Sequence, residues 1–292
     1  MKETVESTQV RDVYAIVTNR IINLLEQGVV PWRKTWTSAG QPQNLITKIP
    51  YHGINVLLLN SLGYSSNSFL TFKQIGSLGA KVRKGEKGTA IVFWKWIEKD
   101  KDGTEEKERK PLLKYYFVFN VSQCENIPLE MLPIVTKPLE PIHDCEVIVQ
   151  NMPNRPVIKT SVEDPFYSPK EDYINMRDIN DFAANEDYYS VLFHEMIHAT
   201  GHTSRLNRRE VMNNSKYRSE LYSLEELTAE IGACFLKSHV GFSDSTYENS
   251  AAYIQGWLSK LKSDKRFIVY AAAQAQRAAE FILDVKVATG EE

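Results

Sequence analysis

Apolar positions in the first third of the chain follow a helical period. Over residues 10–25 they recur at spacings of three and four, and Gly28 follows as a stop signal. Residues 53–63 (GINVLLLNSLG) and 71–79 (TFKQIGSLG) predict two further short helices, each ended by a glycine. Thr71 is suited to open the second of them, because its hydroxyl can accept a hydrogen bond from the first helical turn.

The pattern then changes from helix to strand. Residues 88–99 (GTAIVFWKWIEK) and 112–123 (LLKYYFVFNVSQ) are rich in β-branched and aromatic side chains. The charged stretch between them contains an Asp-Gly pair, which favours a tight turn. We therefore predict a β-hairpin with a long tip.

A proline-spaced segment, residues 126–141 (NIPLEMLPIVTKPLEP), has neither period. Its four prolines are typical of a linker. We predict one domain over residues 1–130, a linker over 131–142 and a second domain over 143–292.

The predicted second domain combines short strands with longer helices. Strands are predicted for CEVIV, PVIKTSV and YINM, which begin at residues 145, 156 and 173. Helical spacing predicts one helix from about Asp187 to Thr200, another from about Tyr222 to His239, and two more before the end of the chain. The predicted fold class is α+β, in two domains.

Composition narrows the class of protein. The chain has 292 residues, of which 42% are hydrophobic and 25% charged, as in soluble globular proteins. Its three cysteines form no C-x-x-C pair, so a disulfide framework or a cysteine zinc ribbon is not indicated. The sequence shows neither a signal peptide nor an apolar run long enough to cross a bilayer, so we expect a cytoplasmic protein with no membrane partner.

The stretch HEMIHATGH, residues 194–202, carries the clearest chemical signal. On a helix, His194 and His198 lie one turn apart on the same face and can direct two imidazole nitrogens at one ion. Glu195 is placed to take a proton from water at a metal site. This arrangement predicts one Zn²⁺ per chain, with the two histidines as ligands and Glu195 as the catalytic base.

A catalytic zinc site needs a third protein ligand, and three side chains compete. His202 follows a glycine that should end the helix, so we expect it beside the site or in packing. Glu226 and Glu230 lie one turn apart on a later helix, and we predict Glu226 as the ligand and Glu230 as a residue that orients a histidine. Ser223 could instead engage Glu226 in a capping box, which leaves Glu225 and Glu230 as alternatives.

A tyrosine could complete the catalytic set. Tyr217 precedes Glu226 by nine residues, and its hydroxyl could stabilise a developing oxyanion. An ordinary structural tyrosine is the alternative.

The front half of the chain combines basic and aromatic residues. Residues 1–136 hold 18 Lys and Arg against 13 Asp and Glu, a net charge of +5, whereas the remainder carries −7. Single-stranded nucleic acid stacks its bases on aromatic rings while cations contact its phosphates. The candidate residues for such binding are Trp32, Arg33, Trp36, Arg83, Lys84, Lys87 and Trp94. Packing of these tryptophans in a core is the competing interpretation.

Several blocks of the sequence resemble one family. They include VVPWRKTW, QNLITKIPYHGIN, FLTFKQIGSLGAKVRKGEKGTAIVFW and YYSVLFHEMIHATGHTSRLNR. These blocks are similar to ArdC-type antirestriction proteins of conjugative plasmids, whose N-terminal domain also occurs in TraC-type plasmid primases. The resemblance implies a single-stranded-DNA-binding domain joined to a zincin-like metallopeptidase domain.

Specific residues follow from this resemblance. The metal pattern of the family falls on His194, His198 and the glutamate of EELTAE, with Glu195 as general base. Its N-terminal signature falls on Pro31, Trp32, Asn44, Tyr51, Gly53, Asn55 and the VRKGEKG stretch, which adds Asn44, Tyr51 and Asn55 to the DNA-binding candidates.

The sequence therefore predicts an antirestriction protein of a mobile element. It would bind single-stranded DNA, carry a zinc metallopeptidase site of the glutamate type, and protect incoming DNA from host restriction, with a host restriction-system protein as a possible substrate or target. The alternative is a DNA-coating protein that cleaves nothing, whose zinc domain is structural or binds a partner.

Overall fold

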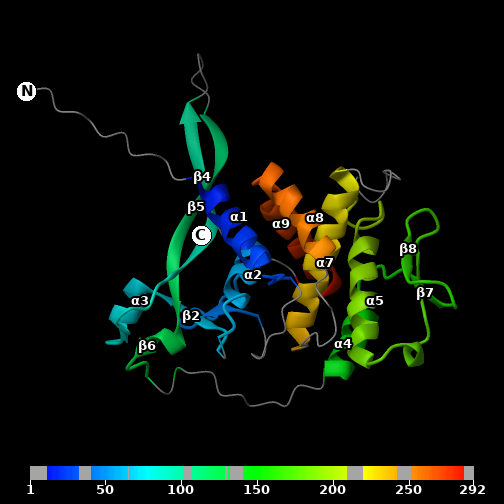
Figure 1. Cartoon of the computed structure of the whole chain (residues 1–292), viewed down its shortest axis with the longest axis horizontal. Helices are drawn as coiled ribbons and strands as arrows, with labels where there is room; N and C mark the ends of the chain where they lie inside the picture. Colours follow the sequence, from blue (N-terminus) through cyan, green and yellow to red (C-terminus); the bar gives the residue numbers. More distant parts are fainter. Residues whose placement is uncertain are drawn as a thin grey trace, which may run out of the picture.

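The structure is a computed structural model of the chain. It describes residues 12–32, 41–64, 66–100, 107–128, 131, 141–208, 220–241 and 251–285. Most of the predicted linker and the hairpin tip therefore lie outside the described residues. In the described part, helices gather in one body and a long two-stranded hairpin stands out from its edge (Figure 1).

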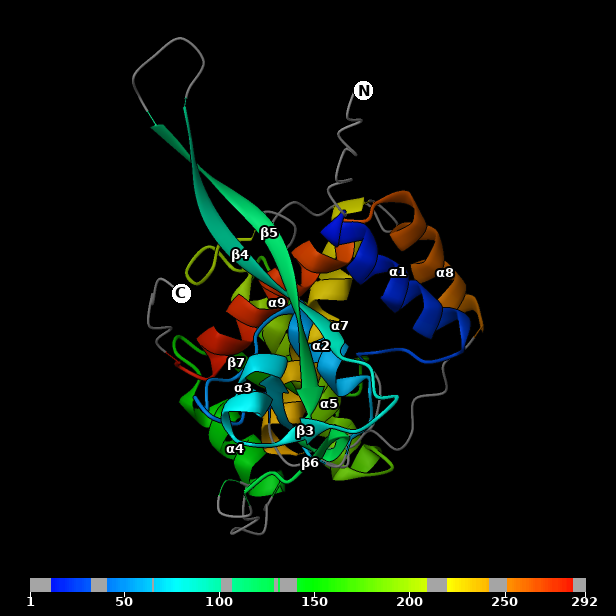
Figure 2. The same cartoon turned by 90° about the vertical axis from the view of Figure 1, so that its left-hand side faces the viewer.

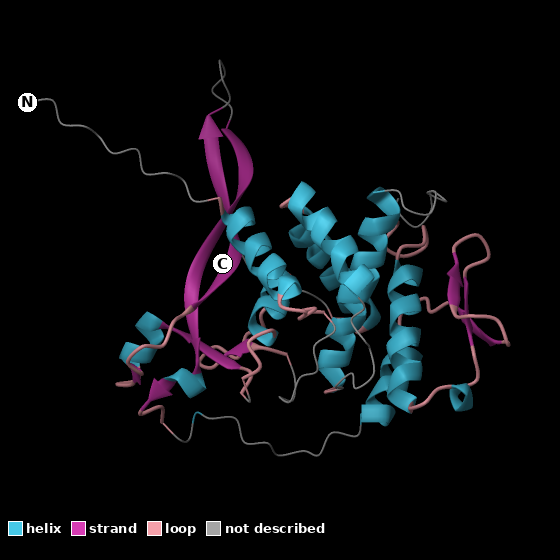
Figure 3. Cartoon of the chain, in the orientation of Figure 1, coloured by secondary structure: helices cyan, strands magenta, loops and turns pink. Residues whose placement is uncertain are grey.

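Helices and strands are mixed along the whole chain, which confirms the predicted α+β class (Figure 3). The α-helices are α1 (Val13–Glu26), α2 (Ile54–Asn60), α3 (Phe72–Ser77), α4 (Pro141–Asn151), α5 (Asn185–Thr200), α7 (Glu220–Val240), α8 (Ala251–Ser263) and α9 (Phe267–Ile282). The strands are β1 (Gln43–Asn44), β2 (Ser68–Thr71), β3 (Lys81–Val82), β4 (Thr89–Asp100), β5 (Lys107–Asn120), β6 (Cys124–Glu125), β7 (Val157–Thr160), β8 (Phe166–Ser168) and β9 (Tyr173–Met176).

The predicted hairpin is confirmed as β4 and β5. They pair antiparallel without a break from Thr89 opposite Val118 to Asp100 opposite Lys107. The sheet order is β1-β2-β5-β4, but β2 pairs only with the last residues of β5, from Val118 onward. The rest of the hairpin is consequently a two-stranded ribbon, which twists as it leaves the body (Figure 2).

The three predicted N-terminal helices are also confirmed, as α1, α2 and α3. Thr71 opens α3 as expected: its hydroxyl accepts from the backbone N–H of Gln74, while the Gln74 side chain accepts from the backbone N–H of Thr71. This reciprocal pair is a capping box, which satisfies backbone donors that a helix start otherwise leaves open. Beside α3 lies the small antiparallel pair of β3 and β6.

The predicted strand CEVIV is wrong, because these residues belong to α4. Buried side chains in this region are Cys145, Ile148, Val149 and Met152, a helical spacing of three and four. The two other predicted strands are confirmed as β7 and β9, which pair parallel, and β8 adds an antiparallel edge. Helices α5, α7, α8 and α9 match the four predicted C-terminal helices.

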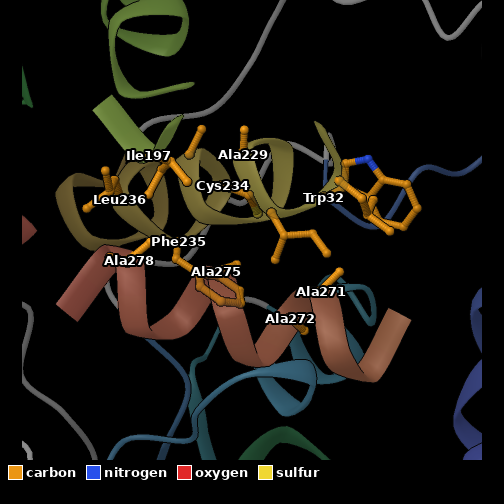
Figure 4. Packing of buried hydrophobic residues seen from close by; sticks show 14 of the residues in the cluster. Trp32, Ile197, Ala229, Cys234, Phe235, Leu236, Ala271, Ala272, Ala275 and Ala278 are labelled. Carbon is orange, nitrogen blue, oxygen red and sulfur yellow. The ribbon is translucent and has the colours of Figure 1, made fainter. Parts of the chain in front are cut away.

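The largest hydrophobic core joins segments from both ends of the sequence. Ile21 of α1 and Leu57 of α2 lie in the same buried cluster as Phe193 of α5 and Ala275 of α9. Figure 4 shows the alanine-rich face of α9 against α7, with Trp32 at one end of the contact. N-terminal helices therefore help to form the core beneath α5 and α7.

Helices α5 and α7 approach closely at one glycine. A Cβ added at Gly232 of α7 would lie 2.6 Å from Cδ1 of Ile197 on α5, nearer than real side chains allow. Ile197 is fully buried, so it has no open space to move into. The glycine lets the two helices that carry the predicted metal ligands pack side by side.

Candidate metal centre

Three side chains from two helices bring their ligand atoms together. The Nε2 atoms of His194 and His198 on α5 lie 3.1 Å apart. The carboxylate of Glu226 on α7 lies 3.7 Å from Nε2 of His194 and 3.6 Å from Nε2 of His198. Among the described residues, this is the one group of three or more such side chains whose ligand atoms all lie within 4.8 Å of one another. Two imidazole nitrogens and a carboxylate oxygen form a donor set that fits a divalent cation.

Glu225 contacts the nitrogen of the His198 ring that does not face the cluster. Its Oε1 lies 3.0 Å from Nδ1 of His198, on the far side of the ring from Nε2. Such a bond fixes the ring orientation and leaves Nε2 to face the cluster. The sequence analysis gave this orienting role to Glu230 and considered Glu225 only as an alternative ligand. For Glu230 the role stays a prediction.

Arg208 in turn holds Glu225. Its Nε donates to Oε2 of Glu225 at 3.0 Å, and its Nη2 donates to Oε1 at 2.6 Å. The guanidinium also donates to the Thr200 hydroxyl and to the Ile197 carbonyl, at 2.6 and 2.7 Å. Arg208 is buried, and no motif in the sequence distinguishes it from its basic neighbours. Its burial and its four hydrogen bonds in the structure are what reveal it.

Burial and neighbouring charges shift the pKa values of Glu225 and His198. Burial alone would raise the pKa of the Glu225 carboxyl, but Arg208 and His198 outweigh burial and hold that pKa below its ordinary value of 4.5. Burial alone would lower the pKa of His198, yet the hydrogen bond to Glu225 and the nearby carboxylates raise it. Glu225 is therefore ionised at neutral pH, and both of its oxygens can accept hydrogen bonds from Arg208.

Glu195 lies beside the cluster on α5 and is 9% exposed. Within the described part of the chain, its carboxylate takes part in no hydrogen bond or ion pair. Its charge contributes to raising the pKa of His198, so the carboxylate lies near the cluster, where an ionised carboxylate can accept a proton. Its role as catalytic base stays a prediction that this environment favours.

One other predicted site residue, His202, lies outside the cluster. The Nδ1 of His202 faces the Ser204 hydroxyl at 2.8 Å and the Asp172 carboxylate at 3.8 Å, which places the ring in the loop after α5. It does not belong to the three-residue cluster. Tyr217 lies outside the described residues.

A second buried arginine fixes the loop that follows α5. Arg205 donates to the Ala199 carbonyl at the end of α5, to the Asn154 carbonyl, and to the Asp172 carboxylate and Tyr167 hydroxyl near the small sheet. Its side chain is only 1% exposed. This network, which sequence reasoning missed, ties β8 and β9 to the end of the histidine helix.

Two of the predicted DNA-binding aromatic residues are corrected by their burial. Trp32 is 1% exposed and lies edge-on against Trp257, at 6.1 Å between ring centroids. Tyr51 is 8% exposed and contacts Phe69. Because neither ring is accessible, neither is available to stack on a base; for Trp32, the alternative of packing in the core holds.

The two predicted asparagines serve the fold. Asn44 accepts from the backbone N–H groups of Ile46 and Thr47 in a turn. Asn55 bonds both the backbone N–H and the carbonyl of Val92, and so covers the edge of β4. These bonds give both asparagines a structural role, and contact with DNA stays a prediction for them.

The remaining candidates are exposed where the structure describes them. Arg83, Lys84 and Lys87 lie on the surface before β4, and Trp94 on the ribbon is 47% exposed. Arg33 and Trp36 lie outside the described residues. No helix within the described ranges is long and apolar enough to span a bilayer.

Comparison with known proteins gives two family models and several relatives. The model of the N-terminal domain of the anti-restriction factor ArdC matches residues 11–119, and that of a zincin-like metallopeptidase matches residues 146–274. DNA primase TraC of Escherichia coli is 32% identical over 91% of this chain, but the chain spans only 26% of that primase. The uncharacterized protein y4eC of Sinorhizobium fredii is 30% identical, with 93% of this chain and 91% of that protein covered.

Solved structures agree with these matches. The metal-free crystal structure of the antirestriction protein ArdC from plasmid R388 is 38% identical, with a TM-score of 0.76 and coverage of 94% of this chain and 97% of that one. Its Mn(II)-bound structure is 36% identical, with a TM-score of 0.73 and coverage of 96% and 100%. A zincin-like domain and a manganese-bound relative both point to a divalent metal. The chain belongs to the ArdC family of antirestriction proteins, with an ArdC-type N-terminal domain and a zincin-like metallopeptidase domain.

Proposed function

We propose that this protein protects incoming plasmid DNA from host restriction by combining single-stranded-DNA binding with zinc-dependent peptide hydrolysis. The observation that carries the hydrolytic part is the convergence of His194, His198 and Glu226, with Glu195 next to His194 on the same helix. We place the division between the two activities at the linker, residues 131–142.

His194, His198 and Glu226 would hold one Zn²⁺, which when bound supplies a Lewis acid that polarises a peptide carbonyl. The side chains of the protein perform the remaining tasks. Glu225 fixes the His198 ring, and Arg208 keeps Glu225 ionised and in place. Glu195 accepts a proton from the attacking water and returns it to the leaving amine, as a general base and then a general acid.

Single-stranded DNA is the proposed partner of the front half. The ArdC-type domain and the similarity to TraC primases support a nucleic-acid partner. The exposed cations Arg83, Lys84 and Lys87 can contact phosphates, and the exposed ring of Trp94 can stack on a base. Binding through these contacts would depend little on base sequence.

The proposed setting is the recipient cytoplasm, where the peptidase would act on a protein of the host restriction system. The test is the efficiency of plasmid transfer into a restricting recipient, with wild type compared to Glu195→Gln. A non-restricting recipient controls for effects on transfer itself. Loss of protection by the variant supports hydrolysis as the function. Full protection by the variant would favour the alternative, in which DNA coating protects and the metal domain cleaves nothing.

A further inference from the structure

Aromatic side chains form a row at the base of the hairpin. Tyr115, Phe117 and Phe119 alternate along β5, so they point to the same face of the ribbon. The ring centroids of Tyr115 and Phe117 lie 5.7 Å apart, and those of Phe119 and Phe72 of α3 lie 6.2 Å apart. We call these four residues the aromatic row.

Two rings of the aromatic row are open to solvent. Phe72 is 70% exposed and Phe117 is 50% exposed. Large apolar rings that remain exposed side by side cost hydration free energy, so they commonly mark a binding surface. Tyr115 and Phe119 are half-buried and anchor the row to the cores on either side.

A cationic loop lies directly beside this row. Lys81, Arg83, Lys84 and Lys87 are all exposed in the stretch that leads into β4. At the end of that stretch, a Cβ added at Gly88 would lie 2.9 Å from Cζ of Phe119 and 3.1 Å from Cβ of Phe117. The segment that carries the cations therefore joins the ribbon next to Phe117 and Phe119.

Gln123 holds this loop in place at both ends. Its carbonyl accepts from the backbone N–H of Arg83 at 2.9 Å. Its side-chain amide donates to the Lys87 carbonyl at 3.1 Å and to the Glu86 carboxylate at 2.8 Å. Because the backbone of the loop is fixed in this way, it need not be ordered again when the cations bind a ligand.

We infer that the aromatic row and the cationic loop form the path of a single-stranded nucleic acid across the base of the hairpin. This inference rests on the proposed DNA binding and names the surface that performs it. The rings of Tyr115 and Phe117 meet edge to face, and those of Phe72 and Phe119 are tilted, so they do not form one continuous stack. The exposed rings of Phe72 and Phe117 therefore suit bases that have separated from one another and stack singly, while the neighbouring cations contact the phosphates.

The opposite face of the ribbon provides a matched control. Phe93 and Tyr116 point to that face, with ring centroids 5.6 Å apart, and Phe93 is 38% exposed. A Phe93→Ala variant removes a phenylalanine ring from the opposite face of the same ribbon and leaves the aromatic row intact.

The experiment measures fluorescence anisotropy of a labelled 20-nucleotide oligothymidylate with the full chain. Phe117→Ala and Phe72→Ala should each raise the dissociation constant roughly tenfold, the effect of one lost base–ring stack. Phe93→Ala should change it less than about twofold, because its ring lies outside the path. Lys84→Ala should reduce the slope of log affinity against log salt by about one. Phe72 is the more exposed ring, so its variant tests the path even if Phe117→Ala folds poorly by circular dichroism.

The outcomes separate the surface from the function. If the wild type binds and both row variants bind equally well, the path is wrong while DNA binding stands. An equal loss in Phe93→Ala would also overturn the path. Failure of the wild type to bind the oligonucleotide would instead overturn the proposed function, and the inference with it.

Discussion

Replacing Arg208 by methionine should leave Glu225 as a buried carboxylate that has lost its main countercharge. The substitution keeps the apolar volume but removes two hydrogen bonds to Glu225, at 3.0 and 2.6 Å. The two side chains are only 3% and 7% exposed, so water cannot replace the lost contacts. Removing one partner of a buried pair costs about 3–5 kcal/mol, which we expect as the loss in unfolding free energy.

The same change should weaken metal binding, because Glu225 orients His198. Loss of such a supporting contact typically costs about 10- to 100-fold in metal affinity. Urea unfolding in the presence of chelator measures the first effect, and competition with a chromogenic chelator measures the second. Adding Glu225→Gln should recover part of the lost stability, since the double variant buries no unpaired charge.

An exposed arginine supplies the control for this prediction. Arg177 bonds Asp164 at 2.9 Å, but their side chains are 42% and 92% exposed. Arg177→Met should therefore cost less than about 1 kcal/mol and leave metal affinity unchanged. The reasoning is refuted if Arg208→Met costs no more than Arg177→Met, or if its effect and that of Glu225→Gln simply add.

Three further changes test other parts of the account. Gly232→Ala should lower the free energy of unfolding in urea by about 1–3 kcal/mol, because the added Cβ would overlap Ile197. Gly256→Ala on α8 is the control: no atom lies within 4 Å of its added Cβ, so it should be neutral or stabilising. Equal effects of the two substitutions would contradict the close packing at Gly232. Trp32→Ala should lower unfolding free energy by about 3–5 kcal/mol while the folded variant keeps its oligonucleotide affinity; selective loss of binding would restore the ring as a DNA contact. Burial raises the pKa of Asp172, but its bonds to Arg205 and Tyr167 outweigh burial and keep that pKa below 3.8. The difference in unfolding free energy between wild type and Asp172→Asn should thus be largest above pH 3.8 and shrink as the pH falls below that value. A difference that stays constant between pH 7 and pH 3 would count against the ion pair.

Local patterns predicted the elements whose signals are long or specific. Two predicted strands of twelve residues on either side of a segment with an Asp-Gly pair identified the hairpin, and Thr71 identified the start of α3. CEVIV misled because a segment of five residues, four of them apolar, is too short to separate the two periods. The helical spacing becomes visible only when the window extends to Met152.

The metal cluster was predictable as a set of residues but not in its supporting contacts. His194 and His198 follow from helical geometry alone, since they lie one turn apart. Glu225 and Glu226 are adjacent in sequence, so only the orientation of α7 decides which carboxylate faces the ion and which lies behind His198. Arg208 reaches Glu225 because the loop after α5 folds back, a tertiary contact that no local pattern encodes.

Two of the aromatic residues predicted to contact DNA, Trp32 and Tyr51, proved to be buried for a related reason. Composition shows that tryptophans and cations are close in sequence, but burial decides whether a ring is available. Trp32 is enclosed by α8 and the core, whereas Phe72 and Phe117, which no motif singled out, remain exposed beside the cationic loop.

The most direct test of the central claim is the zinc content of the purified protein by mass spectrometry, compared among wild type, Glu195→Gln and His194→Ala. The account predicts one equivalent of zinc in wild type and in Glu195→Gln, because Glu195 is not a ligand, and a loss of zinc in His194→Ala. Full zinc occupancy in His194→Ala, or its absence from wild type after exposure to zinc, would contradict a metal centre built on His194, His198 and Glu226.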